Sequence, residues 1–226
     1  MIDGMALPCS PRPTTEEHPM RYILCLLTLC LGGCSVGDYH YSSEAHQRVD
    51  MTVTGIPTVL GIGTLGTTIP LTAEYSLTAG HVAKYSLYRV KAYNPDCDLA
   101  VVYHKNSPNP QPKFRNGMIG DKINMYGYSF ISAMPVASTG TNLINTDMIN
   151  SWNKAGCVVV ATNAGVVQGM SGGAVYNASD DSIAGVIVGY AASISDKKSG
   201  KTLYKDVSLY VPYAGFKDWL DKTLKS

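Results

Sequence analysis

A serine flanked by glycines is the residue of this chain best placed to act as a nucleophile. Ser171 lies in the run Gln168–Ala174 (QGMSGGA), where glycines let the backbone turn tightly and bring its N–H groups close to a ligand. A hydroxyl on such a turn can attack a carbonyl carbon, and the N–H groups of Gly169 and Ser171 can stabilise the oxyanion that forms. Because Gly-Ser-rich turns are also common structural elements, this stretch alone leaves both interpretations open.

Two further segments carry the residue types that such a serine needs. His81 stands among small residues at the end of a β-like run, in the sequence TAGHV that ends at Val82. Asp98 directly precedes an apolar run, in the sequence DCDLAVV that begins at Asp96. A nucleophilic serine requires a base and a group that orients the base. A histidine and an aspartate supply these two roles.

The three segments, in the order His, Asp, Ser, closely resemble the catalytic blocks of chymotrypsin-like (trypsin-fold) serine proteases. This order distinguishes them from subtilisins and α/β-hydrolases, and the resemblance covers residues 50–226. It implies that Ser171 is the nucleophile, that His81 is the base, and that Asp98 holds the imidazole tautomer. Asp96 is the alternative acid. Asp98 is preferred because the residues that follow it match the family block in register.

Two features depart from that family. His81 and Asp98 are 17 positions apart, a much shorter stretch than in typical relatives, so the hairpin between them must be trimmed nearly to its minimum. Met170 stands where trypsin-type zymogens carry an aspartate that pairs with a newly cut N-terminus. Activation by that route is therefore not expected, and the chain looks closer to the compact bacterial and Deg-type members.

The hydrophobic pattern predicts an all-β fold. Short apolar runs are broken by glycine and proline, and Gly (22), Pro (12) and Tyr (15) are abundant. The resemblance implies two six-stranded antiparallel β-barrels followed by a C-terminal helix. Apolar residues at helical spacing predict that helix over Tyr213–Leu224. Strands are expected at Met51–Val53, Thr58–Leu65, Tyr75–Thr78, Leu87–Tyr93, Leu99–Tyr103, Ile123–Tyr128, Ala133–Ser138, Gly156–Thr162, Ala174–Asn177, Ile183–Tyr190 and Leu203–Val211.

A proline-rich stretch, Asn106–Pro112, divides the body of the chain. Proline removes hydrogen-bond donors, so this stretch cannot join the centre of a sheet. We therefore place the first barrel, which carries the histidine and the aspartate, at residues 51–105. The linker between the barrels is expected at residues 106–118. The second barrel, with the serine and the C-terminal helix, is expected at residues 119–226.

The resemblance also indicates where a substrate pocket lies. Gly165, the sixth residue before the serine, stands where relatives often have the base of the specificity pocket. It is not acidic, so a preference for Lys or Arg in the substrate is not expected. Gln168 lies between it and the serine, and Gly189 and Tyr190 belong to the strand expected to flank the substrate. These four residues are the candidate lining of the pocket.

The N-terminal part of the chain has the pattern of an export signal. Residues 20–33 contain Arg21, an apolar run and then small residues, which is typical of a secretory signal and too short for a membrane span. Its end, Leu31–Cys34 (LGGC), resembles the lipobox of bacterial lipoproteins, which implies that Cys34 is acylated and becomes the mature N-terminus. Several acyl chains would anchor the protein stably to the lipid bilayer. The alternative is a generic secretory signal in which this cysteine occurs by chance.

The neighbouring segments follow from this interpretation. Residues 1–19 are rich in proline and contain acidic residues, so we expect translation to begin at Met20 and interpret 1–19 as a gene-model extension or a disordered segment. Residues 34–50 are polar and are interpreted as a tether from the membrane. Ser35 follows the cysteine in place of aspartate. By the family's sorting tendency this favours the outer membrane of a bacterial envelope, facing the periplasm.

Cysteine usage depends on the same interpretation. Cys97 and Cys157 are the cysteines left in the mature body, in an oxidising compartment if the protein is exported. They form either one disulfide, next to two of the catalytic blocks, or two small buried residues, because sequence does not fix the geometry. The chain has no C-x-x-C spacing, so a cysteine-based metal site is not expected.

Composition and motifs together narrow the classes of function. The net charge is +1 and no basic run stands out, so nucleic-acid binding is not expected. The resemblance implies a serine endopeptidase that acts on a protein or peptide substrate without a cofactor. A protease-like lipoprotein that serves as a binding or surface-exclusion module without turnover is the alternative, and an esterase with the same triad is a third hypothesis. The oligomeric state, the substrate and the cleavage preference stay open.

Overall fold

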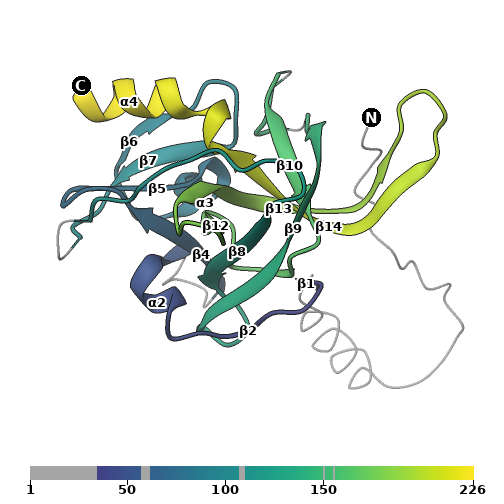
Figure 1. Ribbon diagram of the computed structural model, residues 1–226. Coiled ribbons are helices and arrows are strands. Elements are labelled where there is room, and N and C mark those ends of the chain that lie inside the picture. Colours follow the sequence, from purple (N-terminus) through teal and green to yellow (C-terminus); the bar gives the residue numbers. More distant parts are fainter. Residues whose placement is uncertain (1–34, 57–61, 107–109, 150, 155) are drawn as a thin grey trace, which may run out of the picture.

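The computed structural model describes residues 35–56, 62–106, 110–149, 151–154 and 156–226 (Figure 1). Two antiparallel β-sheets that pack on one another form the body of the described chain. The signal segment 20–33, the predicted lipidation site Cys34 and residues 1–19 lie outside the described residues. Among the described residues, none of the helices is both long enough and apolar enough to cross a membrane.

The first sheet has five antiparallel strands in the order β3-β4-β5-β7-β6. A six-residue helix, α3 (Gly80–Tyr85), directly follows β5. Six strands were expected in this sheet, and among the described residues it has five. The strands are β3 (Asp50–Ile56), β4 (Ile62–Pro70), β5 (Tyr75–Ala79), β6 (Val90–Tyr93) and β7 (Leu99–Tyr103).

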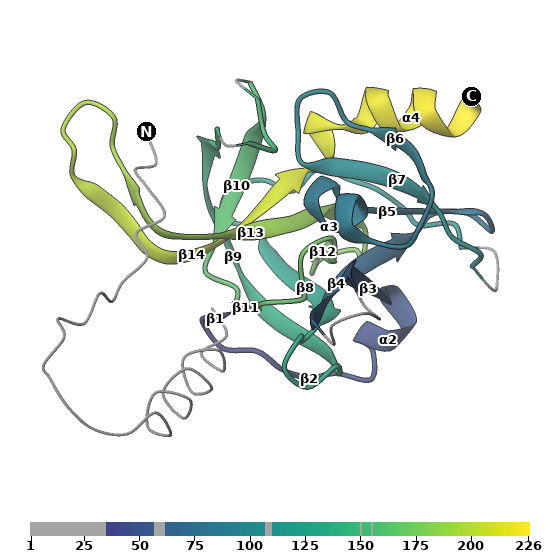
Figure 2. The ribbon, with the colours of Figure 1, turned by 180° about the vertical axis from the view of Figure 1, so that it is seen from behind.

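The second sheet closes into a barrel of six strands, as the sequence predicts. Its order is β10-β14-β13-β12-β8-β9, and an additional pairing of β10 with β9 completes the ring. The hairpin of β13 and β14 continues well beyond the barrel and projects from the rest of the molecule (Figure 2). The strands are β8 (Lys122–Tyr128), β9 (Pro135–Asp147), β10 (Val158–Thr162), β12 (Ala174–Asn177), β13 (Ile183–Ser195) and β14 (Thr202–Pro212).

Strand formation follows the hydrophobic pattern. In β7 four consecutive residues, Leu99 to Val102, are completely buried, as expected for a strand that is covered on both faces. Where one face is open, apolar and polar residues alternate along the strand, as at the start of β8, where Lys122 and Asn124 alternate with the buried Ile123 and Met125. Of the predicted strand Thr58–Leu65, residues 58–61 lie outside the described residues, and β4 runs from Ile62 to Pro70, five residues beyond the predicted end.

The C-terminal helix is present in the predicted place. The chain first makes a 3₁₀ turn, η1 (Tyr213–Gly215), and then the helix α4 (Lys217–Lys225). Phe216 and Leu220 are 1% and 3% exposed and belong to a core cluster with residues of both sheets. Burial of these side chains against the sheets stabilises a nine-residue helix that would be marginal alone.

Residues 35–50 do not form the expected tether. Ser35 and Val36 form β1, which pairs antiparallel with β11 (Val166–Val167). The segment then adds β2 (His40–Tyr41) to the edge of β9 and forms a short helix, α2 (Ala45–Arg48). Among the polar residues that indicated a tether lie a few apolar residues that the fold buries, such as Ala45 at 0% exposure. Residues 35–50 therefore belong to the compact fold.

The N-terminal segment packs tightly against Gly165. A Cβ on Gly165 would overlap the backbone oxygen of Asp38, and Gly37 lies over the same residue with a φ of +67°. The two backbones approach so closely that neither position has room for a side chain. The N-terminal segment thus covers one side of the connection that leads to Ser171.

We expect Gly165→Ala to lower the free energy of unfolding by at least about 2 kcal/mol, because the methyl group must displace the backbone at Asp38. Chemical denaturation followed by tryptophan fluorescence measures this. Gly215→Ala is the matched control, since a Cβ there would make an ordinary 3.6 Å contact with Val211. Equal stability of Gly165→Ala and the wild type would contradict the close packing.

Candidate active site

His81 and Asp98 are brought together by two neighbouring strands of the first sheet. Ala79 at the end of β5 pairs with Leu99 at the start of β7, so the residues just beyond these positions lie side by side. The N–H of Gly80 donates to the carbonyl oxygen of Asp98 (3.0 Å). The short connection of 17 positions therefore suffices, because strand pairing and not loop length brings the two side chains together.

The Asp98 carboxylate contacts His81 twice. Its Oδ1 accepts the backbone N–H of His81 (2.8 Å), and its Oδ2 lies 2.6 Å from the imidazole Nδ1. The side chain of Asp98 is 4% exposed and that of His81 is 29% exposed. An ionised carboxylate only accepts hydrogen bonds, so the proton of a neutral imidazole lies on Nδ1 and Nε2 has a free lone pair. This is the tautomer that a general base requires.

Gly80 gives the carboxylate its room. A Cβ on this residue would lie 2.8 Å from Asp98 Oδ1 and 3.3 Å from the backbone nitrogen of Leu99. This steric conflict explains why the residue before the histidine in the sequence TAGHV is a glycine. Asp96, the alternative acid, is exposed, and its carbonyl oxygen instead accepts the N–H of Lys154 (2.8 Å). Of the two aspartates, Asp98 is the one that contacts His81.

The serine loop, residues 168–173 between β11 and β12 of the second barrel, is hydrogen-bonded to the first sheet through Thr67 in β4. The Thr67 hydroxyl donates to the carbonyl oxygen of Gly169 (2.7 Å) and accepts the N–H of Tyr128 (3.0 Å). The N–H of Thr67 donates to the carbonyl oxygen of Ser171 (2.9 Å). Because all backbone groups buried here need partners, these three bonds fix the loop in position.

The neighbour of the serine, Gly172, lies directly against the strand that leads to the histidine. A Cβ on Gly172 would overlap the carbonyl oxygen of Thr67 and the hydroxyl of Thr78, and would lie 3.0 Å from the nitrogen of Ala79. Ser171 itself is partly exposed. The three residues predicted from the sequence, His81, Asp98 and Ser171, thus belong to elements that meet at the junction of the two sheets.

Two backbone N–H groups in the serine loop are available as donors. Met170, Gly172 and Gly173 donate to Val167, Ile187 and Met170, respectively. By contrast, the N–H groups of Gly169 and Ser171 donate to no acceptor among the described residues. The carbonyl of Gln168 is turned toward the N–H of Phe130 (2.7 Å), and in a trans peptide the N–H of the next residue points the opposite way.

The four predicted pocket residues do not share one surface. Gly165 is buried under the backbone of Asp38, which differs from its expected place at the base of an open pocket. Gln168 is exposed. Tyr190 is 43% exposed, and a Cβ on Gly189 would meet nothing within 4 Å. Gln168, Gly189 and Tyr190 are therefore open to solvent, whereas the N-terminal segment covers Gly165.

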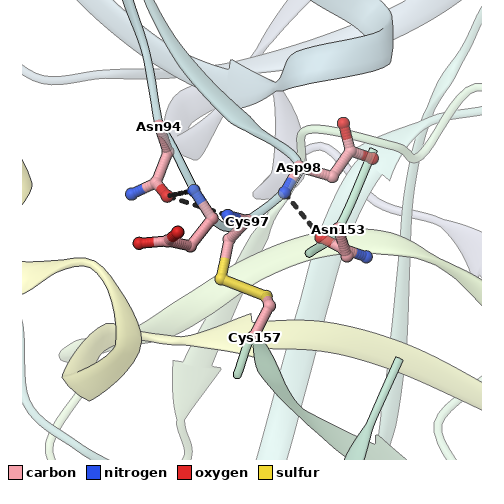
Figure 3. Close-up of a disulfide and its surroundings, with 6 residues drawn as sticks. Asn94, Cys97, Asp98, Asn153 and Cys157 are labelled. Atoms are coloured by element: carbon pink, nitrogen blue, oxygen red, sulfur yellow. Dashed lines mark hydrogen bonds between the residues drawn. A yellow bond between two sulfur atoms is a disulfide. The ribbon is translucent and has the colours of Figure 1, made fainter. Parts of the chain in front are cut away.

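A connection from the second barrel reaches over to the aspartate (Figure 3). Cys97 and Cys157 form a disulfide with a Cα–Cα distance of 5.3 Å, which decides between the two sequence-based alternatives. Asn153 accepts the backbone N–H of Asp98 through its side-chain oxygen (2.6 Å). The ring of Trp152 lies 6.0 Å from the His81 ring. All three partners come from the connection between β9 and β10.

Three residues that contact the candidate site were not predicted from the sequence: Thr67, Trp152 and Asn153. Each acts on a residue more than 50 positions away or in the other sheet, and no local pattern around it marks such a contact. Among the described residues, no group of three or more His, Cys, Asp or Glu side chains is arranged to hold a metal ion.

Thr67→Val keeps the shape of the side chain but removes its hydroxyl. Because the carbonyl of Gly169 and the N–H of Tyr128 would each lose a buried partner, we expect the free energy of unfolding to fall by about 2–4 kcal/mol. Urea denaturation measures the change. Thr202→Val, at an exposed position of β14, serves as the control. If Thr67→Val and the wild type unfold at the same urea concentration, the described fastening of the loop is wrong.

The similarity of this chain to known proteins is found in its fold and not in its sequence. No family model and no curated protein matches the sequence. Solved structures do match, among them the HtrA-type protease AlgW with a tripeptide, at a TM-score of 0.59 and 18% identity over 80% of this chain and 63% of that one. The inactive form of the Rv3671c protease of M. tuberculosis matches with a TM-score of 0.59 and 18% identity over 80% of this chain and 91% of that one.

The serine endoprotease from Yersinia pestis is a third similar structure, with a TM-score of 0.58 and 20% identity over 81% of this chain and 66% of that one. This chain therefore spans less than two thirds of the AlgW and Yersinia structures. At these identities the likeness establishes architecture alone. The two sheets and the C-terminal helix of this chain have the chymotrypsin-like fold of HtrA-type and trypsin-fold serine proteases.

Proposed function

We propose that this protein is a serine endopeptidase that hydrolyses peptide bonds with Ser171, His81 and Asp98. The observation that carries the proposal is the double contact of the buried Asp98 carboxylate with the backbone and Nδ1 of His81. A buried carboxylate is costly unless it is hydrogen-bonded. Its placement at the end of the sheet, next to the strand that abuts the serine loop, has a direct chemical use in orienting a base.

In the proposed reaction Ser171 Oγ attacks the substrate carbonyl carbon while His81 Nε2 takes the hydroxyl proton. The negative charge that develops on the carbonyl oxygen is stabilised by the N–H groups of Gly169 and Ser171. His81 then gives its proton to the leaving amine, and Asp98 stabilises the imidazolium between these steps. Water repeats the sequence on the acyl-enzyme and releases the second product.

A protein or peptide substrate is consistent with the fold. The solved structures of AlgW contain a tripeptide and a decapeptide. In this chain the candidate pocket residues Gln168, Gly189 and Tyr190 are open to solvent. None of these three residues is charged, so a substrate side chain that is neutral at this position is favoured over lysine or arginine.

A fluorophosphonate probe tests for the activated serine. With the full chain purified in detergent, we expect labelling that Ser171→Ala abolishes. His81→Ala and Asp98→Asn should each lower the labelling rate by about 10⁴-fold, because the base is lost or its tautomer is reversed. Asp96→Asn is the matched control and should label at the wild-type rate. A folded wild type that does not label would point instead to a binding or surface-exclusion module without turnover.

We further propose that Cys34 is acylated and anchors the protein to a bacterial envelope membrane, at the outer membrane facing the periplasm. The LGGC sequence that ends at Cys34 supports this. Because β1 begins at Ser35, an acylated Cys34 would hold the second barrel directly at the bilayer surface. Only the N-terminal linkage, and no long tether, would then separate the serine loop from the membrane.

Metabolic labelling with radioactive palmitate in a bacterial host tests the anchor. The wild type should incorporate label and remain in the membrane fraction, and Cys34→Ser should do neither, because the acylated sulfur is lost. Cys30→Ser, in the apolar run of the signal, should behave like the wild type. Equal labelling of Cys34→Ser and the wild type would favour the generic secretory signal.

A further inference from the structure

We propose that Asn153 is a positioning residue for Asp98, and that the Cys97–Cys157 disulfide holds it in place. This proposal rests on the proposed function, because it concerns how the acid of the triad is held. Asn153 belongs to the second barrel, whereas Asp98 belongs to the first sheet. The Asn153 hydrogen bond and the disulfide therefore connect the aspartate and the histidine to the barrel that carries the serine.

The hydrogen bonds around Asp98 fix it on every side. Its carboxylate oxygens bond to His81, and its carbonyl oxygen accepts the N–H of Gly80 (3.0 Å). Its own N–H donates to Asn153 Oδ1 (2.6 Å). Figure 3 shows the carboxylate pointing away from Asn153 and from the disulfide. Asn153 thus acts on the backbone of Asp98 and leaves the carboxylate free for the imidazole.

The loop before Asp98 needs this outside partner. Between β6 and β7, the side-chain oxygen of Asn94 accepts the N–H groups of Asp96 (2.9 Å) and Cys97 (2.8 Å). That turn satisfies the two preceding residues but ends before Asp98. The N–H of Asp98 is buried with its residue, and a buried donor without an acceptor is costly. Asn153, which is 1% exposed, provides the acceptor from the other barrel.

Two further contacts hold the connection that carries Asn153. The disulfide joins Cys157 to Cys97, the residue directly before Asp98. The N–H of Lys154 donates to the carbonyl oxygen of Asp96 (2.8 Å). Asn153 is therefore followed directly by two attachments to the same loop, one hydrogen-bonded at Lys154 and one covalent at Cys157. The Trp152 ring, beside His81 at 6.0 Å, extends the contact to the imidazole.

Reduction of the disulfide should loosen this arrangement. A dithiol such as dithiothreitol donates two electrons and two protons, the Cys97–Cys157 bond breaks into two thiols, and the dithiol closes into its own cyclic disulfide. The hydrogen bond that Asn153 accepts from Asp98 and the one that Lys154 donates to Asp96 then act without a covalent support. A shift of about 1 Å in a catalytic group can lower a rate by about 100-fold, so a measurable loss is expected.

The experiment measures the second-order rate constant of fluorophosphonate labelling of the full chain in detergent. We expect Asn153→Leu to lower it about 10- to 100-fold. In the Asp98→Ala background the same substitution should change it less than about twofold, because the group that Asn153 positions is gone. Asn177→Leu is the matched control: Asn177 is also 1% exposed and hydrogen-bonded to a distant backbone group, Arg115 O at 3.0 Å.

Dithiothreitol provides the second arm. It should slow labelling of the wild type and leave the rate of the Cys97→Ser/Cys157→Ser double variant unchanged, and that variant should label at the slow rate throughout. Denaturation curves of all variants report folding separately, so a general loss of structure would appear equally in Asn177→Leu. Disulfide-dependent labelling together with non-additivity at Asp98 supports the proposal.

The contrary outcomes are distinct. If Asn153→Leu lowers the rate equally with and without Asp98, or no more than Asn177→Leu does, Asn153 has a general structural role and the proposal is overturned. If Asn153→Leu and the Cys97→Ser/Cys157→Ser double variant both label as fast as the wild type, this proposal fails while the proposed function stands. If the wild type is folded and does not label, both fail.

Discussion

Thr67 links the two sheets through three hydrogen bonds at the serine loop. It lies in the first sheet and is completely buried, yet it bonds to Gly169, Ser171 and Tyr128 of the second barrel. Backbone groups in such an interior must be paired, so the serine loop has one acceptable position relative to β4. The approach is so close that the residue after the serine must be a glycine. This contact therefore sets the position of the serine loop against β4.

The connection between His81 and Asp98 in the first sheet is short, and residues of the second barrel make additional contacts with both ends of it. The connection between the histidine and the aspartate contains only the rest of the short helix α3, in which His81 lies, and the four-residue strand β6. Such a short hairpin covers little of the site, and the connection between β9 and β10 supplies Trp152, Asn153 and a disulfide in its place. A crosslink across 60 positions reduces the entropy of the unfolded chain, by about 4 kcal/mol in the loop-closure model. The same bond thus contributes to stability and to the arrangement of the acid.

The N-terminal segment shows how a polar stretch can belong to a core. Its side chains are mostly polar, but Val36, Ala45 and Val49 are 8%, 0% and 1% exposed, and its backbone fills the space beside Gly165. As a result the surface next to the serine loop differs from the open pocket expected from the sequence. It also leaves no spacer between Cys34 and the folded domain, which would place the loops of the second barrel near a membrane if that cysteine is acylated.

Sequence by itself determined the residue types and local patterns: a serine between glycines, a histidine after a β-like run, an aspartate before an apolar strand, and strands and a helix close to where they occur. These features depend on short-range sterics and on hydrophobic periodicity, which are readable along the chain. Tertiary structure alone decided which groups meet. Strand pairing of Ala79 with Leu99 selected Asp98 over Asp96, and packing of the sheets brought Thr67 to the serine loop and Asn153 to the aspartate. It also placed Asp38 over Gly165. Such contacts join residues far apart in sequence, and their energy depends on shape and hydrogen-bond partners that exist only after the chain has folded.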